Sequence, residues 1–218
     1  MNFQVKSLGM ALIAGFGLTV SAIAAPLPPG SVLFGPSTET DPTGGSSVAT
    51  LSAPFTVAGA FSGTLTTDVI SGDTSNPFGG LTFVYTITND GVAGPNSIGR
   101  LSLSEFAAFS ADGSYQIPLA VGAVAPASID RNPSGDVVGF NFVPVASDPA
   151  TGFLAPGATS AKIVIQTDAT AYVTGAFASV IDGGVGTVSA IVPVPEPSTV
   201  VLSLVGLAGA ALFARRRG

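Results

Sequence analysis

Residues 81–88 limit the possible fold more than any other stretch of this chain. Apolar and mostly polar residues alternate there: Leu81, Phe83, Tyr85 and Ile87 on one side, Thr82, Val84, Thr86 and Thr88 on the other. A period of two residues is typical of a β-strand with one face against a core. The turn Asn89-Asp90-Gly91 follows directly and ends the strand. We therefore expect a half-buried strand at this place.

Short β-prone runs, separated by Gly, Pro, Asn and Asp, continue along the chain. The expected strands are residues 48–57, 61–70, 81–88, 98–103, 115–124, 137–143, 161–167, 172–181 and 187–192. Residues 105–110 suit either one helical turn or an edge strand. Such spacing predicts an all-β fold, an antiparallel β-sandwich. No segment here shows a helix-length apolar stripe, and a parallel α/β sheet needs such helices as crossovers.

The N-terminal end has the pattern of a secretory signal peptide over residues 1–24. Lys6 supplies the positive charge, residues 8–20 are apolar, and Ala22 and Ala24 form an A-x-A site. We expect a signal-peptide helix that signal peptidase removes before Ala25. Residues 25–47 follow as a mostly extended leader, in which residues 32–34 suit a short strand, and residues 48–192 form the sandwich domain.

The C-terminal residues 193–218 combine three features in a fixed order. Residues 194–199 form a short motif that contains Pro195, Glu196 and Pro197. Residues 198–214 are apolar and predict a transmembrane helix, although residues 200–214 alone reach only roughly 22 Å. The tail 215–218 supplies Arg215, Arg216 and Arg217, which favour the cytoplasmic side and leave the preceding chain outside.

This tripartite end resembles the PEP-CTERM sorting signal of Gram-negative bacteria. The residues that match are Pro195, Glu196 and Pro197, then the apolar run, then the three arginines. The resemblance implies export, anchoring in the inner membrane with the domain in the periplasm, and processing near the motif by an exosortase. It also implies a destination at the outer surface or in an extracellular polysaccharide matrix. An ordinary short membrane anchor after a Pro-rich linker is the alternative.

The strand at residues 82–90, with residues 156–168 and 180–184, is similar to a loose set of exported PEP-CTERM proteins with β-sandwich domains. Most of those proteins have no assigned activity. This second resemblance therefore implies a fold and supplies no catalytic residue.

Composition excludes several classes of function. Residues 26–194 carry twelve acids against three bases, Arg100, Arg131 and Lys162, a net charge of −9. Such an acidic domain does not attract nucleic acid, which requires clustered cations. The chain has no Cys and no His, so disulfides, thiolate nucleophiles, Ser-His-Asp catalysis and zinc sites built on His are excluded.

Carboxylates in turns are the candidates for binding a metal. Asp90, Asp112 and Asp182 each precede a glycine, and calcium binds oxygen ligands from such turns. Asp before Gly is also what β-turns prefer, so the pattern leaves both interpretations open. We expect no required cofactor, with calcium as the alternative.

Other candidate groups are weaker. Glu105 and Asp112 are the carboxylates that a glycosidase-type pair would use. Lys162 lies near Ser160 without the spacing of a Ser–Lys dyad, and we interpret it as a solvated strand residue. Asp130 and Arg131 are expected on opposite faces of a strand, as separate surface contacts.

Together these observations predict an exported structural or interaction protein and no enzymatic activity. The expected partners are exosortase, signal peptidase, the inner membrane and extracellular polysaccharide. A calcium-assisted adhesin or glycan-binding module is the alternative function, and a carboxylate-dependent hydrolase is the third.

Overall fold

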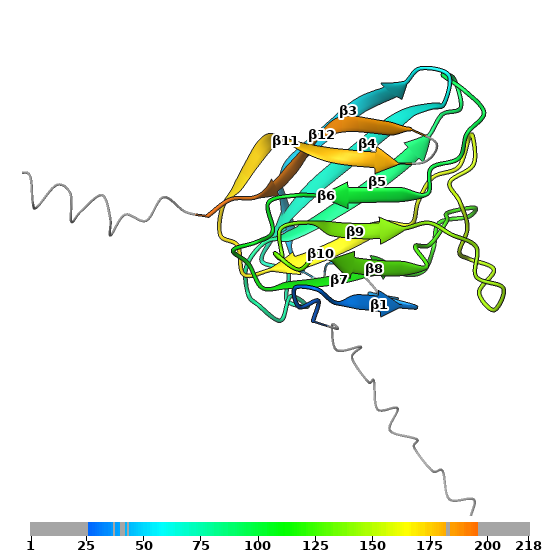
Figure 1. Cartoon of the computed structure of the whole chain (residues 1–218). Helices are drawn as coiled ribbons and strands as arrows, with labels where there is room; N and C mark the ends of the chain where they lie inside the picture. Colours follow the sequence, from blue (N-terminus) through cyan, green and yellow to red (C-terminus); the bar gives the residue numbers. More distant parts are fainter. Residues whose placement is uncertain (1–25, 37, 40–41, 43, 182–183, 196–218) are drawn as a thin grey trace, which may run out of the picture.

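The computed structural model describes residues 26–36, 38–39, 42, 44–181 and 184–195 of the 218-residue chain. These residues form a β-sandwich of two six-stranded sheets (Figure 1), as the spacing of short strands predicted. The signal-peptide helix and the transmembrane helix expected at the two ends lie outside the described residues. Within the described part of the chain, no helix has the length and apolar character needed to cross a membrane.

The strands follow one another without helices in the described residues. They are β1 (Val32–Phe34), β2 (Thr38–Glu39), β3 (Ser46–Val57), β4 (Phe61–Ser71), β5 (Thr82–Asn89), β6 (Arg100–Leu103), β7 (Ala111–Gln116), β8 (Ser128–Arg131), β9 (Val138–Asn141), β10 (Ile163–Thr167), β11 (Tyr172–Ile181) and β12 (Val185–Pro193). Sheet A has the order β2-β7-β10-β5-β4-β3, and sheet B has the order β1-β8-β9-β6-β11-β12. All pairs of neighbouring strands are antiparallel except the short β2–β7 pair.

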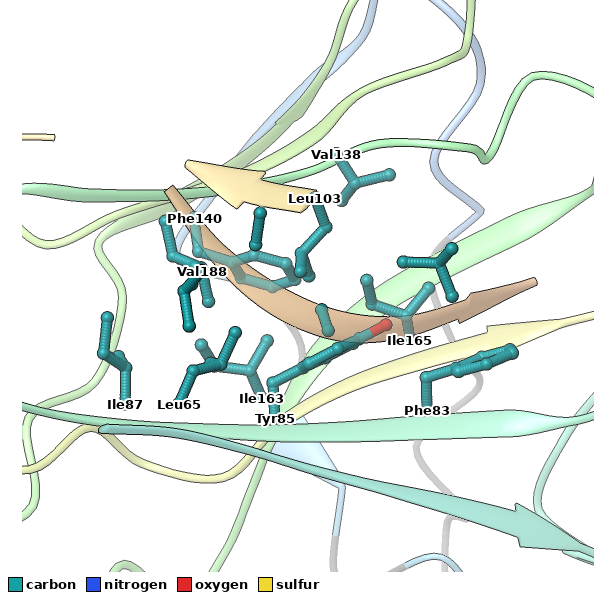
Figure 2. Close-up of a cluster of buried hydrophobic side chains, with 14 of the residues drawn as sticks. Leu65, Phe83, Tyr85, Ile87, Leu103, Val138, Phe140, Ile163, Ile165 and Val188 are labelled. Atoms are coloured by element: carbon teal, nitrogen blue, oxygen red, sulfur yellow. The ribbon is translucent and has the colours of Figure 1, made fainter. Parts of the chain in front are cut away.

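The core lies between the two sheets and begins with the alternation of β5. Phe83, Tyr85 and Ile87 are fully buried, as predicted for the apolar side of this strand. Figure 2 shows these side chains facing those of sheet B across the sandwich, with Phe140 and Val188 among them. The inward side chains of β5 therefore form the centre of the fold.

Tyr85 also links the two sheets by a hydrogen bond. Its hydroxyl donates to the carbonyl oxygen of Ile191 on β12 at 2.8 Å. Complete burial raises the pKa of the Tyr85 phenol well above its ordinary value. The hydroxyl thus stays protonated and keeps its role as donor throughout the ordinary pH range.

The outward side chains of β5 are less exposed than the sequence predicted for a half-buried strand. Thr82 is 0% exposed and Val84 is 8% exposed, while Thr86 and Thr88 are half-buried. The loop between β4 and β5 covers the Thr82 end, where Asp73 and the Thr82 hydroxyl are hydrogen-bonded. The predicted alternation is confirmed on the core side, and the β4–β5 loop changes the exposure of the other side.

Part of the predicted leader belongs to the sandwich. Leu27 is fully buried, and its N–H donates to the carbonyl oxygen of Ala111 at 2.9 Å. β1 confirms the short strand that residues 32–34 suggested, and it pairs with β8. The N-terminal segment is therefore needed to complete both the core and the edge of sheet B.

The strand pairings place both ends of the described chain at the same end of the strands. Pro26 bridges to Asp112 at the start of β7, and Pro193 pairs with Tyr172 at the start of β11. β10, whose last residue Thr167 pairs with Ala111, reaches β11 through only four residues. The loops after β7 and β9 lie at the opposite end, where Arg100 pairs with Asn141.

Several predictions about strands differ from the structure. The strand expected at residues 115–124 begins earlier, at Ala111, and ends at Gln116, because Pro118 lacks the N–H that a ladder needs. β2 and β8 were not predicted. Residues 105–110 form neither a helical turn nor an edge strand: Glu105 has a φ of 75°, and the Phe109 N–H donates to the Phe106 carbonyl in a turn.

Candidate functional site

The sorting motif begins where the sandwich ends. The ladder of β12 continues to Val194, whose N–H donates to the carbonyl oxygen of Ala171 at 3.1 Å. Pro195 follows and is exposed. The other predicted residues of this end, Glu196, Pro197, Arg215, Arg216 and Arg217, lie outside the described residues, as do Ala22, Ala24 and Ala25 at the signal cleavage site.

A cavity of about 660 Å³ lies on the outer face of sheet A, at the end of the strands opposite to Pro26 and Pro193. Thr86 of β5 is its floor, and the loop after β7 and the segment before β10 are its walls. The residues that line it are Thr86, Gln116, Pro118, Leu119, Ala120, Val121, Gly122, Ala123, Gly157, Thr159, Ser160, Ala161 and Lys162. Pockets for small molecules are typically of this size.

Lys162 is the one charged side chain among the described residues that line this cavity. It lies directly before β10 and is exposed, which confirms that it is solvated. No other described residue forms an ion pair or hydrogen bond with its ammonium group. Beside it, Gln116 and Thr86 are half-buried and present an amide and a hydroxyl.

A smaller cavity of about 100 Å³ adjoins the first and shares Gln116 and Lys162 with it. Asp68 of β4 lines this second space. The Asp68 carboxylate accepts a hydrogen bond from the Ser47 hydroxyl at 2.5 Å. Lys162 therefore stands between a carboxylate on one side and, on the other, a cavity whose described lining residues include no acid.

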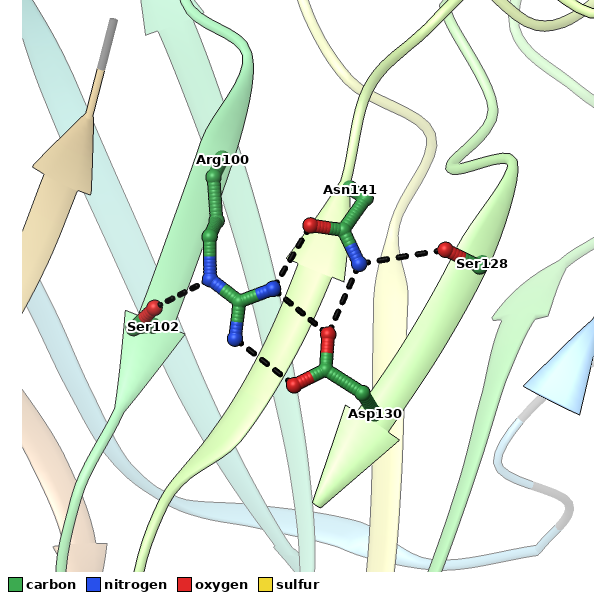
Figure 3. A network of polar contacts seen from close by, with 5 residues as sticks. All are labelled: Arg100, Ser102, Ser128, Asp130 and Asn141. Carbon is green, nitrogen blue, oxygen red and sulfur yellow. Dashed lines mark hydrogen bonds and ion pairs between the residues drawn. The ribbon is translucent and has the colours of Figure 1, made fainter. Parts of the chain in front are cut away.

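A polar network on the outer face of sheet B holds three neighbouring strands together (Figure 3). Arg100 donates two hydrogen bonds to the Asp130 carboxylate, at 2.5 and 2.7 Å, and a third to Asn141 at 2.6 Å. Asn141 in turn donates to Ser128 and Asp130. Burial alone would raise the pKa of Asp130, but the hydrogen bonds from Arg100 and Asn141 and the charge of Arg100 hold that pKa below its ordinary value.

Arg131 is not the surface contact that the sequence predicted. Arg131 is 4% exposed, and each of its hydrogen-bond acceptors among the described residues is a main-chain carbonyl oxygen. Because Asp130 and Arg131 do lie on opposite faces of β8, Asp130 joins the outer network while Arg131 points inward. Both groups have structural partners.

The β4–β5 loop is fixed by buried polar side chains. The Asp73 carboxylate accepts from the Thr82 hydroxyl at 2.7 Å and from the Gln166 amide at 3.0 Å. The Asn76 amide donates to the carbonyl oxygens of Gly80 and Thr167, both at 3.0 Å. These contacts hold the loop over the outer face of sheet A.

The calcium candidates do not come together. The register places Asp112 level with Gln166 and Gln166 level with Thr82, eight residues before Asp90. At about 3.3 Å per residue, Asp90 and Asp112 are therefore about 26 Å apart along the sheet, too far to bind one ion. Asp182 lies outside the described residues. Among those that are described, no three acidic side chains form a group that can hold a metal.

Asp90 and Asp112 also have different surroundings. Asp90 is exposed and accepts hydrogen bonds from the Ser62 hydroxyl and the Val92 N–H, which hold its pKa below the ordinary value. Asp112 is 1% exposed and lies on the outer face of sheet A, level with Gln166, which binds the β4–β5 loop. Glu105, in contrast, is exposed. The pair Glu105 and Asp112 thus does not present two carboxylates to a common substrate.

The fold and the C-terminal end define a β-sandwich ectodomain followed by a sorting signal. Residues 193–217 match the family model described as the PEP-CTERM protein-sorting motif, so the chain carries this motif. The match implies export, a membrane-anchored sorting signal and an exosortase as the processing partner. No curated protein sequence matches the chain, and no solved structure matches it.

The cavity was not predicted from the sequence. Its polar groups come from β5, from the end of β7 and from the residue before β10, which are distant in the chain. The alternation of residues 81–88 did place Thr86 on the outer face. The missing information was the strand order, which sets β10 between β5 and β7.

Proposed function

We propose that this protein is delivered to the bacterial outer surface or the extracellular polysaccharide matrix, where its sandwich acts as a non-enzymatic structural or interaction module. In this proposal, signal peptidase removes residues 1–24 after export, and the apolar segment 198–214 holds the chain in the inner membrane. An exosortase then processes the chain near Pro195, Glu196 and Pro197.

One observation carries the proposal. The last strand of the sandwich ends at Pro193, and the match to the sorting motif begins at residue 193. The chain therefore has no further folded element between the completed domain and the signal. This arrangement is what delivery of one intact domain requires, because cleavage after the sandwich leaves every described strand in place.

The polar groups of the sandwich support a non-enzymatic role. Arg100 and Asp130 bind each other, Arg131 binds carbonyl oxygens, and Asp73 binds Thr82 and Gln166. A catalytic acid or base needs access to a substrate, and these groups are instead used to join strands and loops. An interaction module requires only a stable surface.

Intact-mass measurement tests the proposal. The full chain is expressed in a host that has an exosortase and in a matched host that lacks it, and the mature protein is located and weighed. We expect a start at Ala25 in both hosts and an end near residues 195–199 only where the enzyme is present. The isosteric Glu196→Gln variant should keep its tail in the host with the enzyme, because the charge of the motif is lost.

A mass that reaches Gly218 in both hosts, with the protein in the inner membrane, would contradict the proposal. The tail would then be a simple anchor, and the sandwich would act at the periplasmic face. The Pro144→Ala variant, changed at an exposed proline of a loop in the sandwich, is the control and should be processed like the wild type.

A further inference from the structure

The cavity on the outer face of sheet A differs in charge from the acidic domain around it. Acids outnumber bases twelve to three in residues 26–194, yet none of the described residues that line the cavity is acidic, and one is a lysine. The other two bases are fully used by structural contacts, Arg100 with Asp130 and Arg131 with carbonyl oxygens. Lys162 is therefore the cation that this domain offers to a ligand.

The walls of the cavity indicate the rest of the ligand. Thr86 contributes a hydroxyl group and Gln116 an amide, while the hydroxyl of Thr159 shares a hydrogen bond with that of Thr88 at 3.0 Å. Pro118, Leu119 and Val121 form an apolar side. None of the lining residues that the structure describes is aromatic, so they offer no ring face for stacking. Such a surface suits a compact molecule that combines one anionic group with several hydroxyls and aliphatic C–H groups.

We propose that this cavity binds an acidic sugar, a ring with a carboxylate such as a uronate, with the carboxylate at Lys162 and the hydroxyls toward Thr86 and Gln116. A charged hydrogen bond is roughly twice as strong as a neutral one, so the ammonium decides the specificity. This assignment goes beyond the sorting role and names a ligand for the interaction module. The sugar can be free or part of a polymer, since both present the same carboxylate.

Asp68 provides a second, opposite test of anion binding at Lys162. Its carboxylate lines the adjoining cavity on the other side of Lys162 and repels any anion that binds there. Removal of this charge should therefore improve binding, whereas removal of the Lys162 charge should weaken it. A general effect of unfolding would weaken binding in both variants, so opposite signs identify the site.

The experiment is a titration of the ¹⁵N-labelled full chain in a non-ionic detergent with D-glucuronate, and with D-glucose as the neutral control. We expect amide shifts in residues 117–123 and 157–162, and glucuronate should bind at least about tenfold more tightly than glucose. Lys162→Gln should reduce the affinity for glucuronate to that for glucose, Lys162→Arg should retain most of it, and Asp68→Asn should increase it.

Two threonines provide a matched pair of variants. Thr86 lines the cavity, and its cross-strand partner Thr66 on β4 does not. Thr86→Val should weaken binding about threefold to tenfold through loss of one hydrogen bond, and Thr66→Val should leave it unchanged. A glucuronate trimer distinguishes the two sources: tighter binding than the monomer points to a polymer, and equal binding per molecule points to the free sugar.

Four results would overturn the proposal: equal affinity for glucuronate and glucose, an unchanged affinity in Lys162→Gln, shifts outside the two wall segments, or no shift up to high millimolar sugar. Amide spectra of the unliganded variants show that the fold is kept. Because binding is measured on the purified chain, the ligand assignment can fail while the sorting proposal stands.

Discussion

Replacement of Arg131 by methionine should destabilise the sandwich more than any other change at a charged residue described above. The guanidinium joins three separate segments to β8. Its donors meet carbonyl oxygens of Gly135 at 2.8 Å, Leu27 at 3.1 Å, Phe106 at 2.6 Å and Phe109 at 2.7 Å. Burial lowers the pKa of Arg131, and the charge of Asp168 acts against this, so the group remains protonated at neutral pH.

The magnitude follows from these contacts. Methionine has a similar length and no donor, so the Arg131→Met variant leaves four carbonyl oxygens without the charged partner. Each hydrogen bond to a charged group contributes about 1.5–3 kcal/mol, and such losses are not additive. We expect a total loss of about 3–5 kcal/mol in the free energy of unfolding. This is a large part of the roughly 5–15 kcal/mol that stabilise a typical domain.

Urea unfolding of the full chain in a non-ionic detergent measures the loss. The signal is circular dichroism or tyrosine fluorescence, since the chain has no Trp. Arg100→Met is the matched control, because the Arg100–Asp130 pair is partly exposed, with 27% and 23% of the side chains accessible, and should cost only about 1 kcal/mol. Equal losses in the two variants, at an unchanged m-value, would show that water replaces the contacts of Arg131 and would refute this reasoning.

Two further predictions use the same unfolding assay. Asp130→Asn should be less stable than the wild type at pH 7 by about 1 kcal/mol. The folded-state pKa of Asp130 is depressed, so the stability that its carboxylate contributes is complete above the unfolded pKa of about 3.9 and is lost as the pH falls through the folded pKa. The stability difference between wild type and Asp130→Asn should therefore shrink below pH 4. A difference that stays constant with pH would contradict the role of Arg100. Gly63→Ala should cost about 3 kcal/mol or more, because a Cβ would lie 1.8 Å from the Thr88 carbonyl oxygen. Gly152→Ala, where the nearest atom is 3.9 Å away, should stay within about 0.5 kcal/mol, and similar losses at both glycines would count against the close packing of β4 on β5.

The sequence predicted the parts of the fold that local patterns determine. β11 has the predicted bounds, and β3, β4 and β5 differ from prediction by one or two residues at an end. The residues of β5 alternate clearly enough for the period of two to be recognised, and the other three are long runs with many β-branched or aromatic residues. The sandwich then follows from many such strands joined by turns, and the structure confirms it.

Features set by tertiary contacts were not predictable in this way. β8 has only four residues, and its inward positions are Ile129 and Arg131. A charged residue at an inward position hides the period of two, and carbonyl oxygens from other segments make its burial possible. The same holds for Leu27, which reaches the core from a Pro-rich segment that resembles a linker.

The sorting motif could be predicted from a local sequence pattern, whereas the cavity depends on tertiary structure. Residues 193–217 are contiguous, so their order alone was sufficient to recognise the motif. The groups of the cavity are brought together by the strand order, with β10 between β5 and β7. Asp112 looked like a turn residue suited to a metal, but it lies within β7 and is buried.

The hydrogen bond of Val194 to Ala171 limits how a processing enzyme can approach the chain. With the membrane segment beginning at Ser198, as the sequence predicts, only three residues, 195–197, separate Val194, the last rung of the ladder, from the lipid. The four Cα-to-Cα steps from residue 194 to residue 198 span at most about 14 Å when fully extended. An exosortase must therefore have a shallow, lateral active site that fits between the sandwich and the headgroups, or β12 must detach from β11 before the peptide bond is cut.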